Sequence, residues 1–215
     1  RIKDAALLAN QWGWYDQSIM SFARSGFMDD VEKRFPLAYA SEFSVMGETY
    51  NVKPAFAMAI ARRESTFRSD AISPAGAAGL MQLMPGTARY LAQKKLSRDT
   101  LFEPEQNLQF GVQYLRYLAN KLGDNPVLIS ASYNAGWRKV LQWLPEDADQ
   151  PTDVWIENIP YKETRHYVKA VMAYRYIYEH QLSGPSELFQ QLAESAIPSS
   201  QRISDQGQSL QLAPD

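Results

Sequence analysis

The chain has 215 residues, 45% of them hydrophobic, and a net charge of −2 at pH 7, which is ordinary for a globular protein. A charge this close to zero gives no general attraction to nucleic acid or acidic membranes, and no apolar run is long enough to span a bilayer. The absence of cysteine excludes disulfides, thiolate metal ligands and a cysteine nucleophile. The two histidines, His166 and His180, are too far apart in sequence to form a helical metal pair.

The first segment predicts two short amphipathic helices between Ile2 and about Arg24, broken at Trp12-Gly13-Trp14. The expected apolar face of the first helix consists of Ala5, Leu8, Ala9 and Trp12. Such a helical pair resembles one unit of a solenoid, which cannot bury its apolar face without neighbours. The chain also starts at Arg1 without a signal-peptide pattern, so we expect a processed or truncated piece whose N-terminal part is missing.

Two helices are predicted next. Phe35-Pro36 opens the first, with Leu37, Tyr39, Ala40, Phe43 and Met46 as its apolar residues, and Gly47 is expected near its end. Asn51 and Pro54 start the second helix, since proline is well tolerated in a first turn, where its missing N–H has no partner to lose.

Glu64 lies near the end of this second helix. Phe56, Ile60 and Glu64 are four residues apart and therefore share one helix face. A carboxyl group in line with an apolar stripe has a raised pKa if it is buried, which would make it a usable general acid near neutral pH. The alternative from this pattern alone is a solvated glutamate at the end of the stripe.

Residues 69–83 have no helical period and contain glycine and proline, so they predict a tight loop or a short β-hairpin. Further helices are predicted from Thr87 to Leu91, from Glu103-Pro104 to before Gly123, from Pro126 to Tyr133, around Val140 to Leu144, and from Thr164 to Leu182. Ser186 is expected to cap a last short helix, and residues from Pro198 on are predicted to be a flexible tail. The predicted fold class is therefore mainly α.

Several common catalytic motifs are absent. The chain has no Gly-x-Ser-x-Gly elbow, no His-Glu-x-x-His pair and no phosphate-binding glycine loop with a following lysine. Aromatic and amide side chains are plentiful, and these suit the apolar faces and hydroxyl edges of sugar rings, although most aromatic residues are expected to pack in the core.

Four motifs in order resemble those of the soluble lytic murein transglycosylases, the lysozyme-like enzymes of the bacterial periplasm. They are Glu64-Ser65, the run from Ser73-Pro74 through Gly79-Leu80-Met81-Gln82-Leu83-Met84-Pro85-Gly86-Thr87-Ala88, Tyr133-Asn134-Ala135-Gly136, and Ile159-Pro160-Tyr161-x-Glu163-Thr164-Arg165-x-Tyr167-Val168. The resemblance covers roughly residues 35–182. It implies a lysozyme-like helical catalytic domain over 35–182, preceded by the end of a helical solenoid or linker region over 1–34 and followed by a short helix and tail over 183–215.

The resemblance also implies roles for individual residues. Glu64 matches the single catalytic acid and base. The implied substrate-binding or site-lining residues are Ser73, Gly79, Gln82, Met84, Tyr133, Asn134 and Glu163. Five of these residues have a plain structural alternative. Ser73 could be a turn serine, Gly79 a turn glycine, Met84 a core residue, Asn134 a helix cap and Glu163 the partner of Arg165 or Lys169 in a surface ion pair. Arg62 and Arg63 are interpreted as surface or structural residues.

The resemblance further implies the reaction. Glu64 would protonate the glycosidic oxygen between N-acetylmuramic acid and N-acetylglucosamine, and the muramoyl 6-hydroxyl would then attack to give a 1,6-anhydro product without metal or cofactor. The implied partners are peptidoglycan glycan strands and stem peptides in the periplasm, and other cell-wall enzymes are possible partners. A goose-type lysozyme, a non-catalytic murein-binding module and a purely structural solenoid remain alternatives.

One departure from the family pattern is visible in the sequence. Trp137 and Arg138 stand where the family often has proline or another small residue and then glycine. They place an aromatic ring and a cation directly after Tyr133-Asn134-Ala135-Gly136. This departure could alter a sugar subsite or merely change a turn.

Overall fold

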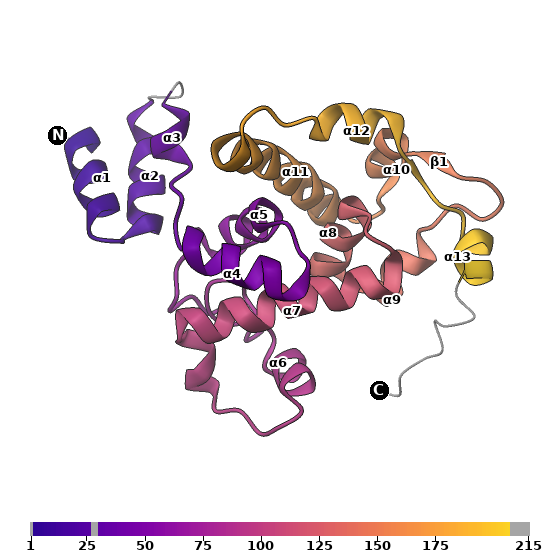
Figure 1. Cartoon of the computed structure of the whole chain (residues 1–215), viewed down its shortest axis with the longest axis horizontal. Helices are drawn as coiled ribbons and strands as arrows, with labels where there is room; N and C mark the ends of the chain where they lie inside the picture. Colours follow the sequence, from indigo (N-terminus) through magenta and orange to yellow (C-terminus); the bar gives the residue numbers. More distant parts are fainter. Residues whose placement is uncertain (1, 27–29, 207–215) are drawn as a thin grey trace.

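A computed structural model describes residues 2–26 and 30–206 of the chain, and Figure 1 shows their arrangement. Helices make up most of the described chain, and a two-stranded antiparallel sheet is its only multi-residue β structure within those ranges. The predicted mainly α class is therefore confirmed. In the described residues, no helix has both the length and the hydropathy required to cross a membrane.

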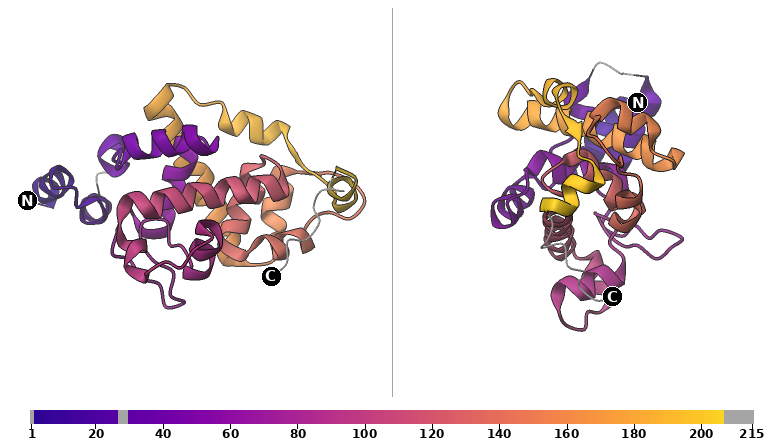
Figure 2. Two further views of the ribbon diagram at one scale, coloured as in Figure 1. Left: turned by 60° about the horizontal axis from the view of Figure 1, so that its bottom comes forward. Right: turned by 90° about the vertical axis from the view of Figure 1, so that its right-hand side faces the viewer.

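The N-terminal segment forms α1 (Ile2–Gln11), α2 (Tyr15–Ser25) and α3 (Val31–Arg34), which lie together at one end of the molecule in Figures 1 and 2. The break at Gly13 has φ 74°, as the predicted turn requires. The predicted face of α1 is wrong in part, because Ala5, Leu8 and Trp12 are exposed and Ala6 is buried beside Ala9.

Helix α4 (Ala40–Tyr50) begins later and ends later than predicted. Tyr39 has a left-handed backbone with φ 54°, which keeps Phe35 and Leu37 outside the helix. Gly47 lies inside α4 and does not end it. Its place is explained by packing, because a Cβ there would meet the Val52 carbonyl oxygen at 2.6 Å.

Three helices build the centre of the main core: α5 (Pro54–Ser65), α8 (Pro126–Ala135) and α11 (Lys162–Ser183). Helix α5 is buried from Ala55 to Arg62, so it is the central helix of the core. Arg175 of α11 lies over the Phe56 ring near the start of α5, and Tyr167 of α11 contacts Glu64 near its end. Helices α5 and α11 are therefore antiparallel.

The remaining elements surround this core. They are α6 (Pro85–Ala92), the 3₁₀ helix η1 (Arg98–Phe102), α7 (Pro104–Leu122), α9 (Trp137–Gln142), α10 (Thr152–Asn158), α12 (Leu188–Glu194) and α13 (Ser200–Gln206), with β1 (Gln150–Pro151) pairing β2 (Ala196–Ile197). Proline occupies the first turn of α5, α6, α7 and α8. The starts of α5, α7 and α8 were predicted at or beside these prolines, whereas α6 begins two residues before the predicted Thr87.

The C-terminal region is more ordered than predicted. The expectation of a tail from Pro198 is wrong as far as Gln206, because α13 forms there. The Ser199 amide donates to Asp149 at 3.0 Å, and the Ser200 amide donates to the Pro145 carbonyl at 2.8 Å. These contacts anchor the segment to the residues before β1, while residues 207–215 lie outside the described chain.

Candidate active site

Glu64 lies in the last turn of α5 and is partly buried. Ile60 and Phe56, one and two turns earlier, are buried, so the predicted stripe forms as expected. Helix α5 ends because Thr66 and Phe67 adopt left-handed backbones with φ 54° and 64°. This tight end turns the chain away from the helix directly after the carboxyl group and leads it into residues 69–83.

Tyr167 is the direct hydrogen-bond partner of Glu64. Its hydroxyl donates to Oε1 of the carboxyl group at 2.6 Å. The guanidinium of Arg63 lies 5.4 Å from the centre of the Tyr167 ring. Sequence reasoning quoted Tyr167 as part of a motif but assigned it no role, because the two residues are 103 positions apart and no spacing rule connects them.

Burial raises the pKa of Glu64 from its ordinary value of 4.5 to about 7. The Tyr167 hydrogen bond and the positive charge of Arg63 lower it, and the negative charge of Glu163 raises it. Desolvation is the largest of these effects. The carboxyl group is therefore poised to give and take a proton near neutral pH.

Tyr133 is the second tyrosine near the carboxyl group. Its hydroxyl donates to the Met81 carbonyl at 2.8 Å, which connects α8 to the loop of residues 69–83. Burial raises the pKa of Tyr133 well above its usual value, and the nearby charge of Glu64 adds to the rise. Tyr133 is therefore a neutral hydrogen-bonding group beside Glu64, in line with its predicted place.

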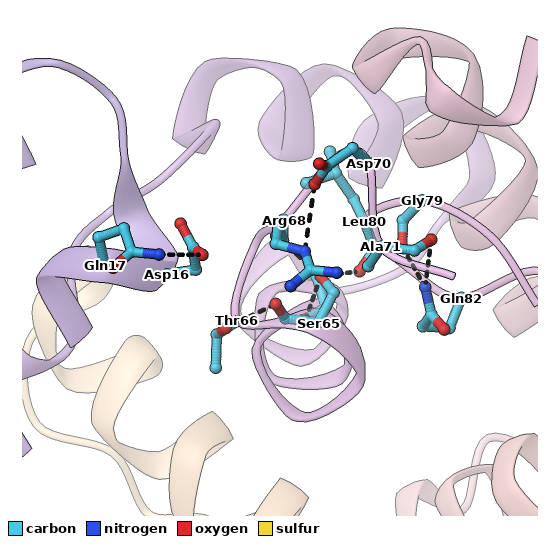
Figure 3. Close-up of polar contacts among 11 residues, drawn as sticks. Asp16, Gln17, Ser65, Thr66, Arg68, Asp70, Ala71, Gly79, Leu80 and Gln82 are labelled. Atoms are coloured by element: carbon cyan, nitrogen blue, oxygen red, sulfur yellow. Dashed lines mark hydrogen bonds and ion pairs between the residues drawn. The ribbon is translucent and has the colours of Figure 1, made fainter. Parts of the chain in front are cut away.

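The loop after α5 is held to the helix end by Ser65. The Ser65 hydroxyl donates to the Leu80 carbonyl at 2.7 Å and accepts from the Arg68 amide at 3.0 Å. Figure 3 shows these residues together with the ion pair of Arg68 and Asp70. The residue next to the acid thus holds the following loop to the end of α5, a role that sequence reasoning did not assign.

Within this loop, isolated bridges join Ile72 to Ala78 and Ala78 to Leu83, so the predicted loop or hairpin is a tight bridged loop. The Ser73 hydroxyl accepts from the Ala77 amide at 3.0 Å, which is the geometry of a turn serine. Gln82 donates from Nε2 to the carbonyls of Ala71 and Gly79, as Figure 3 shows. Its Oε1 atom is not used in these bonds.

Gly79 is required by close packing. It has φ 79°, and a Cβ there would meet the Leu101 carbonyl oxygen at 2.1 Å and Asn107 Nδ2 at 2.2 Å. Asn107 is buried, donates to the Ala78 and Leu101 carbonyls and accepts from the Met81 amide. It fastens the loop to α7, and sequence reasoning missed it because a lone asparagine within a predicted helix gives no distinguishing signal.

Met84, Asn134 and Glu163 complete the predicted set. Met84 is 45% exposed at the start of α6 and so is not a core residue. Asn134 accepts a hydrogen bond from the Thr164 hydroxyl at 2.7 Å, which joins the end of α8 to the first turn of α11. Glu163 is exposed and makes no ion pair with Arg165 or Lys169: Arg165 donates to the Ile159 carbonyl, and Lys169 pairs with Glu157.

Of the two arginines before Glu64, only Arg63 is near the site. Arg62 is buried and lies over the Phe35 ring at 3.9 Å, with the Tyr174 ring at 5.1 Å. It joins the segment before α4 to α5 and α11, so it is structural as predicted. Among the described residues, no cluster of three or more histidine, aspartate or glutamate side chains is arranged to hold a metal.

Comparison with known proteins identifies the family of this chain. The chain matches the model of the transglycosylase SLT domain over residues 42–156 and that of the soluble lytic transglycosylase helical domain over residues 158–187. The second match covers most of α11, which packs in the same core as α5. The assignment of residues 1–34 to the end of a solenoid or linker region stays a prediction.

Similar proteins are lytic transglycosylases. The soluble lytic murein transglycosylase of Salmonella typhimurium is 40% identical over 173 residues, which cover 78% of this chain and 27% of that protein. The chain thus spans about a quarter of the length of this relative. An inactive Glu→Gln mutant of the lytic transglycosylase Slt from Pseudomonas aeruginosa is 38% identical, with a TM-score of 0.80 over 85% of this chain and 30% of that one.

A complex of the 70-kDa soluble lytic transglycosylase with bulgecin A is also similar in structure. It has a TM-score of 0.77 and 36% identity, over 84% of this chain and 30% of that one. Likeness of this degree confirms the predicted lysozyme-like helical fold.

Proposed function

Because the chain belongs to the family of transglycosylase SLT domains, we propose that it cleaves the β-1,4 bond between N-acetylmuramic acid and N-acetylglucosamine in peptidoglycan. The observation that supports this most directly is a single glutamate, Glu64, at the end of a buried helix with a pKa of about 7. Glycoside cleavage needs a neutral acid at the leaving oxygen, and this carboxyl group supplies one near neutral pH.

The first step is protonation of the leaving group. Tyr167 donates to Oε1, so the acidic proton of neutral Glu64 resides on Oε2 and passes from there to the glycosidic oxygen. The bond between this oxygen and the anomeric carbon of the muramoyl sugar breaks, and both bonding electrons leave with the oxygen. The muramoyl ring becomes an oxocarbenium-like centre.

The second step returns the proton. The 6-hydroxyl oxygen of the same muramoyl sugar bonds to its anomeric carbon, and its proton passes to the Glu64 carboxylate. Glu64 is neutral again, no water is consumed and the product is a 1,6-anhydro sugar. The Tyr167 hydrogen bond stabilises the carboxylate between the two steps.

The other predicted residues surround this acid as substrate-binding groups in the proposal. Gln82 offers its free Oε1, Met84 an exposed thioether, and Tyr133 a neutral phenol. Ser73, Gly79 and Asn134 act mainly by shaping the loop and the ends of α8 and α11. We place the activity on glycan strands and stem peptides of peptidoglycan in the periplasm, with other cell-wall enzymes as candidate partners.

The mass of the products tests the proposed reaction. Purified peptidoglycan is digested with the protein and the soluble fragments are weighed by mass spectrometry. We expect muramoyl ends lighter by one water than those released by hydrolysis. A hydrolysed reducing end would identify a lysozyme-type hydrolase, and undiminished turbidity of the wall suspension would identify a non-catalytic binding module.

The variant Glu64→Gln tests whether the reaction depends on this residue. It keeps the size of the side chain and the acceptor for Tyr167 but removes the acidic proton. We expect product release to fall at least about 100-fold, the lower range for loss of a general acid, with peptidoglycan binding retained. A folded Glu64→Gln protein with near-normal activity would remove Glu64 from the mechanism.

A further inference from the structure

A cavity opens at the end of α5 that is opposite to Glu64. It has a volume of about 260 Å³ and is lined by residues from the starts of α5 and α8 and from α7 and α11. Phe56 is the residue within α5 that lines it, and Glu64 follows eight residues later, or about 12 Å along the helix axis. The predicted catalytic and substrate-binding residues do not line this cavity, so it is separate from the candidate active site.

Arg175 supplies hydrogen-bond donors to the cavity. Its side chain is only 8% exposed, and its Nε atom donates to Glu179 at 2.8 Å. Within residues 2–26 and 30–206, neither of its two terminal nitrogens makes a hydrogen bond. These nitrogens are not fully enclosed, unlike Nε and Nη1 of Arg62, so they keep contact with the open space that Arg175 lines. A buried guanidinium with two unpaired terminal nitrogens is costly unless an acceptor reaches them.

The charges around the cavity leave one positive charge in excess. Three cations line it, namely Lys53, Arg116 and Arg175. Asp124 pairs with Arg116 at 2.8 Å, and Glu179 pairs with Arg175 and, at 3.8 Å, with Lys53. Two acids thus offset two of the three cations among the residues that line the cavity or pair with its lining. The remaining charge favours an anion with a single negative charge.

The rest of the wall is mostly apolar. Helices α5 and α8 both begin at the cavity, and the positive end of a helix dipole also favours an anion. Pockets for drug-sized ligands start at about 300 Å³, so this cavity suits a smaller molecule. A ligand with one anionic end and a short apolar body would complement the wall. The apolar lining residues are Val52, Phe56, Leu115, Ala119, Pro126 and Ile129.

We infer that this cavity binds a small monocarboxylate. The two terminal nitrogens of Arg175 hold the carboxylate, because the fork of a guanidinium matches its two oxygens. The apolar body of the ligand lies against Phe56 and Ile129. A phosphate dianion fits less well, because the excess charge is one and the apolar wall offers its oxygens no donors. The inference does not depend on the proposed function.

Nuclear magnetic resonance tests the site with simple probes. Sodium butyrate is titrated into the protein, with butyramide as the uncharged probe of the same shape and inorganic phosphate as the anion without an apolar body. The methyl signals of Ile129, which lines the cavity, report binding, and those of Ile72, exposed in the loop after α5, are the control. We expect butyrate to shift the Ile129 signals saturably, with a Kd on the order of 1 mM, and to leave Ile72 in place. Equal shifts with butyramide or phosphate, or shifts that do not saturate, would overturn the inference.

The variant Arg175→Lys tests the guanidinium. It keeps the charge but loses the fork, so the Kd for butyrate should weaken about 10-fold. Arg165→Lys is the matched control, because Arg165 is a partly buried arginine of the same helix whose Nε atom is also hydrogen-bonded, outside the cavity. An unchanged Kd in Arg175→Lys, or an equal loss in Arg165→Lys, would contradict the role of Arg175.

A second variant keeps the test decisive if Arg175→Lys does not fold. Ala119→Leu leaves the ion pair of Arg175 and Glu179 in place and fills part of the cavity with a larger side chain. We expect it to abolish the saturable shift of the Ile129 signals, and undiminished butyrate binding in the folded variant would overturn the site. None of these measurements uses peptidoglycan. A failure of this inference is therefore distinguishable from a failure of the proposed reaction.

Discussion

The Tyr167 hydroxyl donates a 2.6 Å hydrogen bond to Oε1 of Glu64, across two antiparallel helices whose residues are 103 positions apart. Burial raises the pKa of the acid, and this bond lowers it. The value of about 7 is therefore a balance between the packing of α5 and a donor on α11. Each side of the balance can be changed separately.

Removing the hydrogen-bond donor of Tyr167 should raise the pKa of Glu64. In Tyr167→Phe the ring packing stays but the hydroxyl is lost, so the pKa of Glu64 should rise. Since the proposed reaction needs neutral Glu64, the alkaline limb of the pH–rate profile should move upward from about 7. Tyr176→Phe, on the same helix and in tilted ring contact with Phe189, is the control. A limb that stays in place would show that the hydrogen bond does not tune the acid.

Neutralising Glu163 should have the opposite effect. Its negative charge raises the pKa of Glu64, so Glu163→Gln should lower that pKa and move the alkaline limb downward. Because Glu163 is exposed, the shift should diminish at high salt. The same pH–rate measurement tests this prediction. An upward shift of the alkaline limb in Glu163→Gln would contradict the proposed effect of the Glu163 charge on the pKa of Glu64.

The raised pKa also predicts how stability depends on pH. The pKa of Glu64 rises from 4.5 in the unfolded chain to about 7 in the folded one, so its contribution to stability is full below pH 4.5 and lost as pH rises through 7. Glu64→Gln cannot ionise. It should therefore be more stable than the unchanged chain at pH 8, by about 1–3 kcal/mol, with little difference at pH 4.

Urea unfolding at the two pH values measures this difference. A stability gain that is equal at pH 4 and pH 8 would point to a packing effect, because only ionisation of Glu64 depends on pH in this range at that position. The comparison needs no substrate. It therefore tests the electrostatics of the site independently of the reaction.

Adding a methyl group at Gly79 should destabilise the fold. Gly79→Ala would place its Cβ against the Leu101 carbonyl and Asn107 at a left-handed backbone position. We expect a loss of about 2–4 kcal/mol in the free energy of unfolding. Gly86→Ala is the matched control, because a Cβ there meets nothing within 4 Å and helix propensity favours alanine. Equal thermal melting points for the two variants would contradict this.

The sequence was sufficient to predict the elements that have local signals. Proline in the first turn marks the start of α5, and the apolar spacing to Ile60 places Glu64 on its buried face. The beginning of α4 was missed because Tyr39 has a left-handed backbone although it is neither glycine nor asparagine, so the sequence carries no local signal for it.

The acid of the site could be predicted from the sequence, but the residues that hold it and the neighbouring loop in place could not. Glu64 and Tyr133 lie in motifs that the resemblance identified, and the structure brings both together. The bond from Tyr167, the brace of Asn107 on the loop and the Ser65 link to Leu80 join segments far apart in sequence. Nothing in local periodicity predicts which distant side chains meet, so such contacts need the folded chain.

The antiparallel packing of α5 and α11 has a consequence for motion. The acid and its donor stand on helices whose buried faces form one core, so they cannot separate unless that core opens as a whole. The amide hydrogens in the α5 segment before Glu64 should accordingly exchange with solvent only through global unfolding, whereas those of the bridged loop should exchange through smaller local openings. The contact between Glu64 and Tyr167 would then persist for as long as the fold itself does.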